Sequence, residues 1–103
     1  MSRAYASDFK EINMEKVIIT VVGKDTVGII ARVCTYLADN HINILDISQT
    51  IVDGYFNMMM VVDIAGVDKK FDDIANEIDS VGQDIGVIIR AQKEEIFDMM
   101  HRV

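Results

Sequence analysis

A chain of 103 residues, half of them apolar and a quarter charged, predicts one folded domain rather than a disordered segment. Its net charge of −7 disfavours nucleic acid and anionic membranes as partners, and no apolar run approaches the roughly 18 residues that span a bilayer. A single cysteine, Cys34, excludes an internal disulfide and a CxxC metal or redox site.

The start of the chain has no apolar core like that of a signal peptide, so we expect a cytoplasmic protein. Residues 1–13 show no sustained periodicity. We set them apart as an N-terminal extension, either disordered or not native. The main domain is expected over residues 14–92, and a C-terminal helix over 93–103.

The first predicted elements alternate between strand and helix. Residues 16–23 read KVIITVVG, which is rich in β-branched residues and too short for a good helix, so we expect a buried strand. Residues 27–41 switch to helical spacing, with an apolar stripe of Ile30, Val33, Cys34 and Leu37. Residues 42–52 alternate again, which predicts a second strand. Its two expected faces are Asn43, Leu45, Ile47, Gln49 and Ile51 against Ile42, Ile44, Asp46 and Ser48.

A hairpin turn is predicted at Asp53-Gly54, because this pair supplies the positive φ angles of a type I′ turn. Residues 55–66 form the expected third strand. A second helix follows over 68–82, with Gly82 as its C-cap, and a last strand over 85–92. The helix's apolar stripe is Phe71, Ile74, Ala75, Ile78 and Val81.

The order βαββαβ predicts an α+β, ferredoxin-like sandwich: a four-stranded antiparallel sheet with both helices on one face, plus the C-terminal helix. Each half also contains a Gly-x-Asp segment before its helix, and we expect Asp25 and Asp68 to cap those helices. The first and third strands are apolar on both faces. The second face therefore needs a cover, from the terminal helix, a partner subunit or both, and a homodimer is the simplest source.

The loop GKDTVG at residues 23–28 is the most specific short motif. We expect Gly23 to reverse the chain, and Gly28 to let a backbone or a ligand come close. Free amides at the start of a helix favour an anion such as a carboxylate, although capping and packing alone also explain these residues. The nucleotide-binding patterns GxGxxG and GxxxxGK[ST] are both absent.

The segment VVGKDTVGIIARVCTYLADNHINILDISQT resembles the ACT domain, a small ligand-binding module of amino-acid metabolism with the βαββαβ order. The resemblance covers residues 16–92. The segments ILDISQT, GYF and IFDMMHRV further resemble a group of stand-alone ACT proteins likened to regulators of glycine cleavage. The resemblance implies a homodimer that binds an amino acid at its interface. The implied contacts are Asp25, Thr26, Val27, Gly28 and Ile29 in the loop, with the backbone of Asn43 and Ile44.

Two polar residues of the second strand are added to the candidate site. Asp46 is expected either to contact a ligand amino group or to act as a charge that protects a sheet edge. Gln49 is expected to contact a ligand or a symmetry mate, or simply to face solvent.

No histidine, cysteine or carboxylate cluster has catalytic or metal-binding spacing, so we expect no enzyme activity, catalytic residue, cofactor or metal. The sequence thus predicts a non-enzymatic regulatory protein that binds a small molecule as a homodimer, with an amino acid as the expected ligand and with neither nucleic acid nor membrane as a partner. The alternative is a ligand-free protein–protein interaction module, or a regulator of a metabolic or transcriptional partner.

Overall fold

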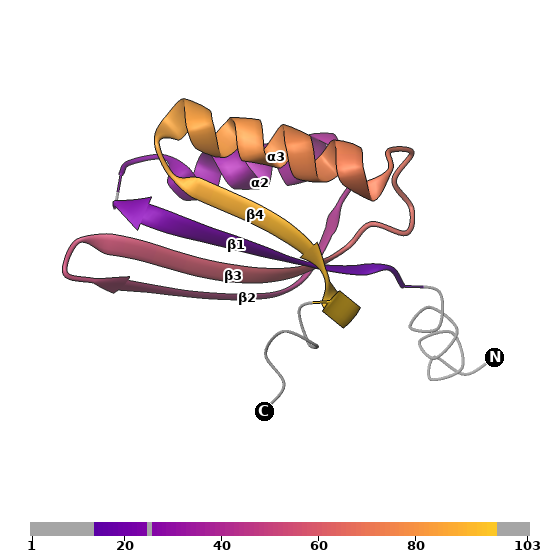
Figure 1. Cartoon of the computed structure of the whole chain (residues 1–103), viewed down its shortest axis with the longest axis horizontal. Coiled ribbons are helices and arrows are strands. Elements are labelled where there is room, and N and C mark those ends of the chain that lie inside the picture. The colour runs from indigo at the N-terminus through magenta and orange to yellow at the C-terminus, as the bar shows by residue number, and fades with distance from the viewer. Residues whose placement is uncertain (1–13, 25, 97–103) are drawn as a thin grey trace.

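The computed structural model describes residues 14–24 and 26–96. Six main elements follow in the expected βαββαβ order (Figure 1). They are β1 (Lys16–Lys24), α2 (Ile29–Asp39), β2 (Asn43–Val52), β3 (Tyr55–Asp63), α3 (Phe71–Ile85) and β4 (Ile88–Lys93). Residues 94–96 begin the expected C-terminal helix, while its remainder, the extension 1–13 and Asp25 lie outside the described residues.

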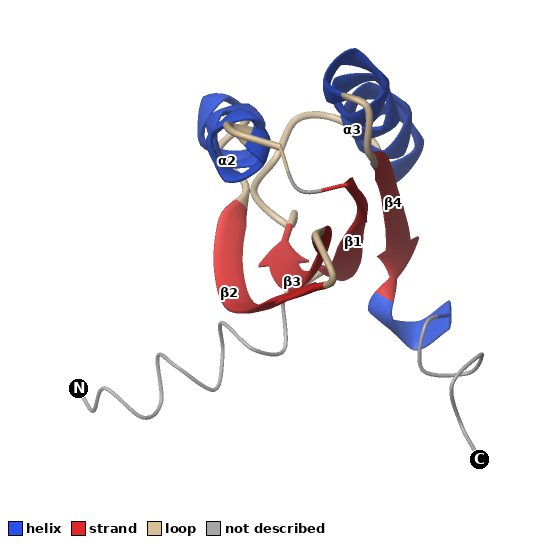
Figure 2. Ribbon diagram, turned by 90° about the vertical axis from the view of Figure 1, so that its left-hand side faces the viewer, coloured by secondary structure: helices blue, strands red, loops and turns tan. Residues whose placement is uncertain are grey.

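The four strands form one antiparallel sheet in the order β2-β3-β1-β4. Both helices cover the same face of this sheet, as Figure 2 shows, so the ferredoxin-like prediction is confirmed. The β2–β3 hairpin turns through Asp53 (φ 52°) and Gly54 (φ 80°), as the Asp-Gly pair predicts. The strands β1 and β3 are central, and β2 and β4 are the two edges.

The core lies between the helices and the sheet. On β1 the side chains of Val17, Ile19 and Val21 are fully buried, because strand alternation directs all three toward α2 and α3. Ile74 and Ile78 face them from α3, which confirms the predicted stripe of that helix. The stripe of α2 differs from the prediction at Ile30, and the predicted stripe residue Cys34 is only half-buried.

In α2 the buried residues are Ile29, Val33 and Leu37, while Ile30 is exposed. The expected stripe included Ile30 in place of Ile29. The reason is the helix start: the positive φ of Gly28 (92°) sets the direction in which the first turn leaves the loop, and Ile29 then points inward.

The second helix and the last strand both lie further along the chain than predicted. The α3 helix runs to Ile85 and ends at Gly86 (φ 79°), so the prediction of Gly82 as C-cap is wrong. Gly82 instead allows close packing, since a Cβ at this position would lie 2.7 Å from the Val87 carbonyl oxygen. Gly82 and Gly86 lie four residues apart, and either could end a helix. Packing against β4 shows that Gly82 permits close contact and that Gly86 is the C-cap.

Two other glycine and cap predictions are also corrected. Gly23 does not reverse the chain but lies within β1, where a Cβ would come within 2.7 Å of the Val87 side chain. The N-cap of α3 is Lys70, which makes no side-chain cap hydrogen bond, so Asp68 does not cap this helix. The N-cap of α2 is Gly28, one residue before the first helical turn.

A β-bulge at Leu45 changes the facing of β2. Asn43 pairs with Asp63 and Ile44 with Val62, but Asp46 then pairs with Val61. Residues directly opposite each other share a face, so Ile44 lies on the helix-covered face and Asn43 on the other. The prediction placed these two the other way round. The faces of Asp46, Ile47, Ser48, Gln49 and Ile51 are as predicted.

The face of the sheet away from the helices is called here the open sheet face. On β1 it carries Ile18, Thr20 and Val22, and on the other strands the residues in register with these three. Met59 of β3 and Ile88 of β4 are exposed on it, as is Val22. Apolar side chains on both faces of the central strands are therefore confirmed, and neither α2 nor α3 covers the second face.

Candidate functional site

The candidate site begins at residues 26–29, called here the α2 loop, which joins β1 to α2. The Thr26 hydroxyl donates a 3.1 Å hydrogen bond to the Lys24 carbonyl oxygen and so closes the loop across position 25. The Ile29 amide donates a 3.5 Å hydrogen bond to the Thr26 carbonyl oxygen, and the Arg32 amide donates to Gly28. Among the described residues, none accepts a hydrogen bond from the amides of Ile30 and Ala31. These donors suit an anion.

A shallow cavity of about 230 Å³ opens beside these amides. Its polar wall is Thr26 and Gly28, and its apolar wall includes Ile30 of α2 and Phe56 of β3. A Cβ at Gly28 would meet no atom within 4 Å, so the expected close approach of a protein backbone does not occur there. The space above Gly28 is open to a ligand. The cavity thus combines amide donors that have no acceptor among the described residues with an apolar floor, as small-molecule sites commonly do.

Most of the predicted loop residues meet at this cavity. Thr26, Gly28 and Ile29 line it, whereas Val27 is fully exposed beside it and Asp25 lies outside the described residues. Ile30 and Phe56 were not predicted as site residues. Phe56 lies opposite Gly23 in the sheet. A glycine opposite a large aromatic side chain is the only sign of this contact in the sequence, and it can be recognised only when the register of β1 and β3 is known.

The predicted residues of β2 are spread over both faces and along the whole strand. Gln49 is nearest to the cavity, because it pairs with Met58, two residues or about 7 Å along β3 from Phe56. Asn43 pairs with Asp63 at the opposite end of the sheet, about 24 Å from Phe56. Asp46 lies on the open sheet face. One chain alone therefore does not bring Asn43, Ile44 or Asp46 to the α2 loop.

The edge strand β2 is exposed along almost its whole length. On the side of the helices, Ile47 is 44% and Ile51 59% exposed, and Ile44 is exposed as well. A long edge strand with apolar side chains readily pairs with another chain, and proteins usually cover or blunt such an edge. This edge is called here the β2 edge.

Away from this cavity, a polar cluster ties the two helices together. The Tyr36 hydroxyl of α2 donates a 2.8 Å hydrogen bond to Oε1 of Glu77 in α3, and Lys69 Nζ lies 2.6 Å from the same oxygen. Burial, and next the bond to Glu77, raises the pKa of Tyr36 well above 10. The hydrogen bonds from Lys69 and then Tyr36 lower the pKa of Glu77. Each polar group has a partner within the cluster, so its role is structural.

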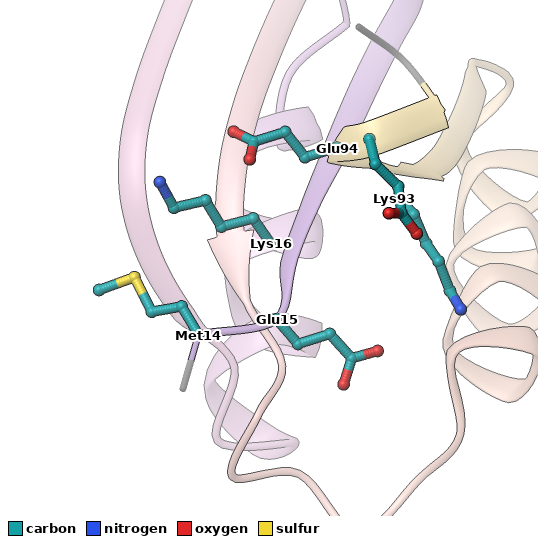
Figure 3. A pocket seen from close by; sticks show the side chains of 6 residues that line it. Met14, Glu15, Lys16, Lys93 and Glu94 are labelled. Atoms are coloured by element: carbon teal, nitrogen blue, oxygen red, sulfur yellow. The ribbon is translucent and has the colours of Figure 1, made fainter. Parts of the chain in front are cut away.

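A larger hollow of about 460 Å³ lies at the other end of the sheet, lined by Met14, Glu15, Lys16, Lys93, Glu94 and Glu95. Figure 3 shows that Lys93 points away from Lys16 and Met14. Its Nζ lies 5.6 Å from the ring centroid of Phe71, on the helix side. The charged groups around this hollow do not converge, and Met14 is the only apolar lining residue. It lacks the apolar floor of a small-molecule site.

Residues 14–24 and 26–96 were compared with the geometry of metal sites and of membrane-spanning helices. No three His, Cys, Asp or Glu side chains among them are grouped to hold a metal ion. No described helix is long and apolar enough to cross a membrane.

Comparison with known proteins identifies the family. The family model for the ACT domain matches residues 15–92. A UPF0237 protein of Bifidobacterium longum is 64% identical over 90 residues, which cover 87% of this chain and 100% of the relative. A solved ACT domain protein from Streptococcus pneumoniae is 46% identical, with a TM-score of 0.70 over 84% of this chain and 97% of that one. The structure of a putative glycine cleavage system transcriptional repressor shares the fold at 21% identity, with a TM-score of 0.69 over 78% of this chain and 46% of that one.

Proposed function

The chain belongs to the ACT domain family, and we propose that it is a regulatory protein that binds an amino acid as a homodimer. The observation that carries this proposal is the cavity at the α2 loop. Amide donors without a described acceptor, the open space above Gly28 and the apolar floor at Phe56 lie within one small volume. Such a combination suits a ligand with a carboxylate beside an apolar or compact side chain.

In the proposed complex, the ligand carboxylate accepts hydrogen bonds from the amides around Gly28. The ammonium group meets Asp25, which lies outside the described residues, or a carbonyl group at the subunit interface. The ligand side chain lies against Ile30 and Phe56, which already border the cavity. Discrimination among amino acids then follows from the size of that apolar space, where one methylene group changes affinity by about tenfold.

The proposed dimer explains why the β2 residues lie so far from the loop. If two β2 edges pair antiparallel about a two-fold axis near Ile47 and Ser48, the end of the strand at Asn43 and Ile44 reaches the Val52 end of the other chain. The Val52 end is the end of the sheet at which the α2 loop lies. The site is then shared by two subunits, and ligand binding and subunit pairing favour each other. The apolar exposure of Ile47 and Ile51 supports this pairing.

The test of ligand binding is thermal unfolding of the full chain against the twenty amino acids at fixed protein concentration. A ligand at about 100 times its dissociation constant adds about 2.7 kcal/mol per site, which raises the melting temperature by several degrees. We expect a stereospecific shift for one or two compounds. A uniform lack of shift, in protein shown to be free of carried-over ligand, would instead favour a ligand-free interaction module.

A matched pair of glycine variants locates the site. Gly28→Asn and Gly86→Asn both place a side chain at positive φ (92° and 79°) with no atom within 4 Å. Asparagine tolerates this conformation better than most residues, so both variants should fold. Only Gly28→Asn should weaken the ligand-induced shift, by about tenfold or more in dissociation constant. Equal binding by the two variants would remove the α2 loop from the site.

The remaining parts of the proposal concern activity and location. We propose that the protein acts through its ligand-bound state on a protein partner, without catalysis and in the cytoplasm. The proposal includes neither nucleic acid nor a membrane as a partner, since the net charge of −7 disfavours phosphate backbones and anionic headgroups. Mass-spectrometric identification of stoichiometric partners, with and without the active amino acid, tests the regulatory role.

A further inference from the structure

A histidine at the far end of α2 has an unusual backbone conformation. His41, which follows this helix, has a positive φ of 58°. Its amide donates a 3.1 Å hydrogen bond to the Ala38 carbonyl oxygen, and the Ile42 amide donates a 2.9 Å hydrogen bond to Leu37, so the helix ends in a Schellman motif. Glycine usually occupies this position, because it adopts a positive φ without steric strain.

The imidazole of His41 has no compensating contact within the described part of the chain. It is exposed, and it forms no hydrogen bond or ion pair with another described residue. The other described non-glycine residue with a positive φ is Asp53, which lies in the Asp-Gly turn where this conformation is expected. Residues held in strained conformations cluster at ligand sites and switch regions. His41 is therefore a candidate for contact with a group outside its own chain.

Within one chain, His41 does not reach the cavity at the α2 loop. The α2 helix lies between His41 and Gly28 and holds them about 20 Å apart, at about 1.5 Å per residue. An imidazole side chain spans only a fraction of that distance. A contact between His41 and a ligand at the α2 loop thus requires a second copy of the chain.

The homodimer proposed above brings these two regions together, so this inference rests on the proposed function. Figure 2 shows α2 on the side of the sheet that carries the β2 edge, and α3 on the side of β4. When two β2 edges pair antiparallel, the two α2 helices lie side by side and run in opposite directions. The His41 end of one helix then lies beside the Gly28 end of the other.

The strand register places His41 of the partner subunit near the level of the cavity. Phe56, the apolar floor of the cavity, pairs with Ile51 in the sheet. In the proposed pairing, Ile51 comes opposite the Ile44 end of the other β2 strand. His41 precedes Ile44 by three residues, or about 10 Å of extended chain. An amino acid bound at the α2 loop, together with the imidazole ring, can bridge this gap.

We propose that His41 of the partner subunit completes the amino-acid site by donating a hydrogen bond to the ligand carboxylate. The Ile30 and Ala31 amides, which have no acceptor among the described residues, are the donors to this carboxylate from the first subunit. A carboxylate has two oxygens and about four acceptor positions, so it can accept all of these bonds. Each of the two sites takes its amides from one chain and its imidazole from the other.

His41→Gly separates a ligand contact from a structural role. Glycine suits the positive φ, so the melting temperature without amino acid should rise by a few degrees. The dissociation constant should also rise, by about tenfold or more, because a hydrogen bond to a charged group is lost. Equilibrium dialysis of the full chain against an equimolar mixture of the twenty L-amino acids, with chromatography of the bound fraction, measures the affinity. A lower melting temperature or unchanged binding would overturn the role of His41.

Two heterodimers with the same substitutions test whether one site uses both chains. In the first, one tagged chain carries Gly28→Asn and a differently tagged chain carries His41→Gly. In the second, one chain carries both substitutions and the other is wild type. A shared site leaves one site of wild-type affinity in the first heterodimer and none in the second. The reverse result would mean that each site lies within one chain, which overturns the proposal.

The outcomes separate this inference from the proposed function. An absence of amino-acid binding to the wild-type protein would overturn both. Binding that is weakened by Gly28→Asn but not by His41→Gly would overturn only the contact of His41. Failure of the two tagged chains to copurify would overturn the β2-edge dimer and the shared site, and amino-acid binding by a single chain would still stand.

Discussion

The two faces of the sheet are built from the same strands but meet different surroundings. The helix-covered face of β1 is entirely apolar, and Val17, Ile19 and Val21 are fully buried beneath α2 and α3. The open sheet face mixes Ile18 and Val22 with Thr20. The first face is sealed within one chain. The second mixes apolar and neutral polar side chains, as protein–protein interfaces and water-exposed surfaces both do.

This difference shows that an apolar strand pattern indicates burial without indicating what covers the residue. The helix-covered face is buried by α2 and α3, and each of these helices follows a strand in the chain. Local sequence therefore specifies what covers this face. The open sheet face around Val22 and the β2 edge stay exposed among the described residues. Four predictions follow from this contrast and from the packing of the helices above the covered face.

The largest expected effect comes from a matched pair of isoleucines. Ile78→Ala removes a fully buried side chain of α3 and should cost about 2–5 kcal/mol of unfolding free energy. Ile88→Ala on the open sheet face should cost less than about 1 kcal/mol in the dilute protein, because that side chain is mostly exposed already. Urea unfolding at two protein concentrations measures both. Equal costs for the two variants would refute the contrast between the two faces.

A second pair of variants tests the close packing of the covered face. In Gly82→Ala the new methyl group would lie 2.7 Å from the Val87 carbonyl oxygen and 2.9 Å from Ile89, so we expect a loss of about 1–3 kcal/mol despite the higher helix propensity of alanine. Gly86→Ala meets no atom and should cost only about 1 kcal/mol of backbone strain. Unfolding curves in urea give the order. A neutral Gly82→Ala would mean that β4 shifts easily from α3.

The hydrogen bond between the helices should have a smaller effect. Tyr36→Phe removes the donor to Glu77 and should cost about 1 kcal/mol. The control is Tyr55→Phe, at an exposed tyrosine of β3 with no recorded hydroxyl partner among the described residues, which should change stability by less than about 0.5 kcal/mol. Thermal unfolding of both variants at pH 7 compares them, and similar losses would contradict the assigned role of Tyr36.

The smallest effect concerns acid. The hydrogen bonds from Lys69 and Tyr36 lower the pKa of Glu77 below its ordinary value of 4.5, so the unfolded chain binds this proton more readily than the native one. The stabilisation from Glu77 is therefore present above pH 4.5 and is lost as the pH falls through the native pKa. Glu77→Gln should lose less stability than the wild type between about pH 5 and 3. Parallel stability curves for the two proteins would show that Glu77 contributes nothing to acid sensitivity.

The sequence alone determined the order of elements, the hairpin at Asp53-Gly54 and the antiparallel sheet with two helices on one face. These features follow from local periodicity and turn chemistry, which neighbouring residues specify together. The stripe of α3 was also predictable, because Phe71, Ile74 and Ile78 repeat at helical spacing. The loop motif at Gly28 was recognisable in the same way, and its conformation required no distant contact.

Only the tertiary structure decided the features that depend on residues distant in the chain. The bulge at Leu45 exchanged the faces of Asn43 and Ile44, because the pairing of β2 with β3 settles where an extra residue is placed. The roles of Gly23 and Gly82 follow from how closely Val87 approaches both, which no local pattern records. The register likewise separated Asn43 from the α2 loop by the length of the sheet. A local pattern shows which side chains are apolar. How closely distant segments approach then decides which of these side chains are buried within one chain.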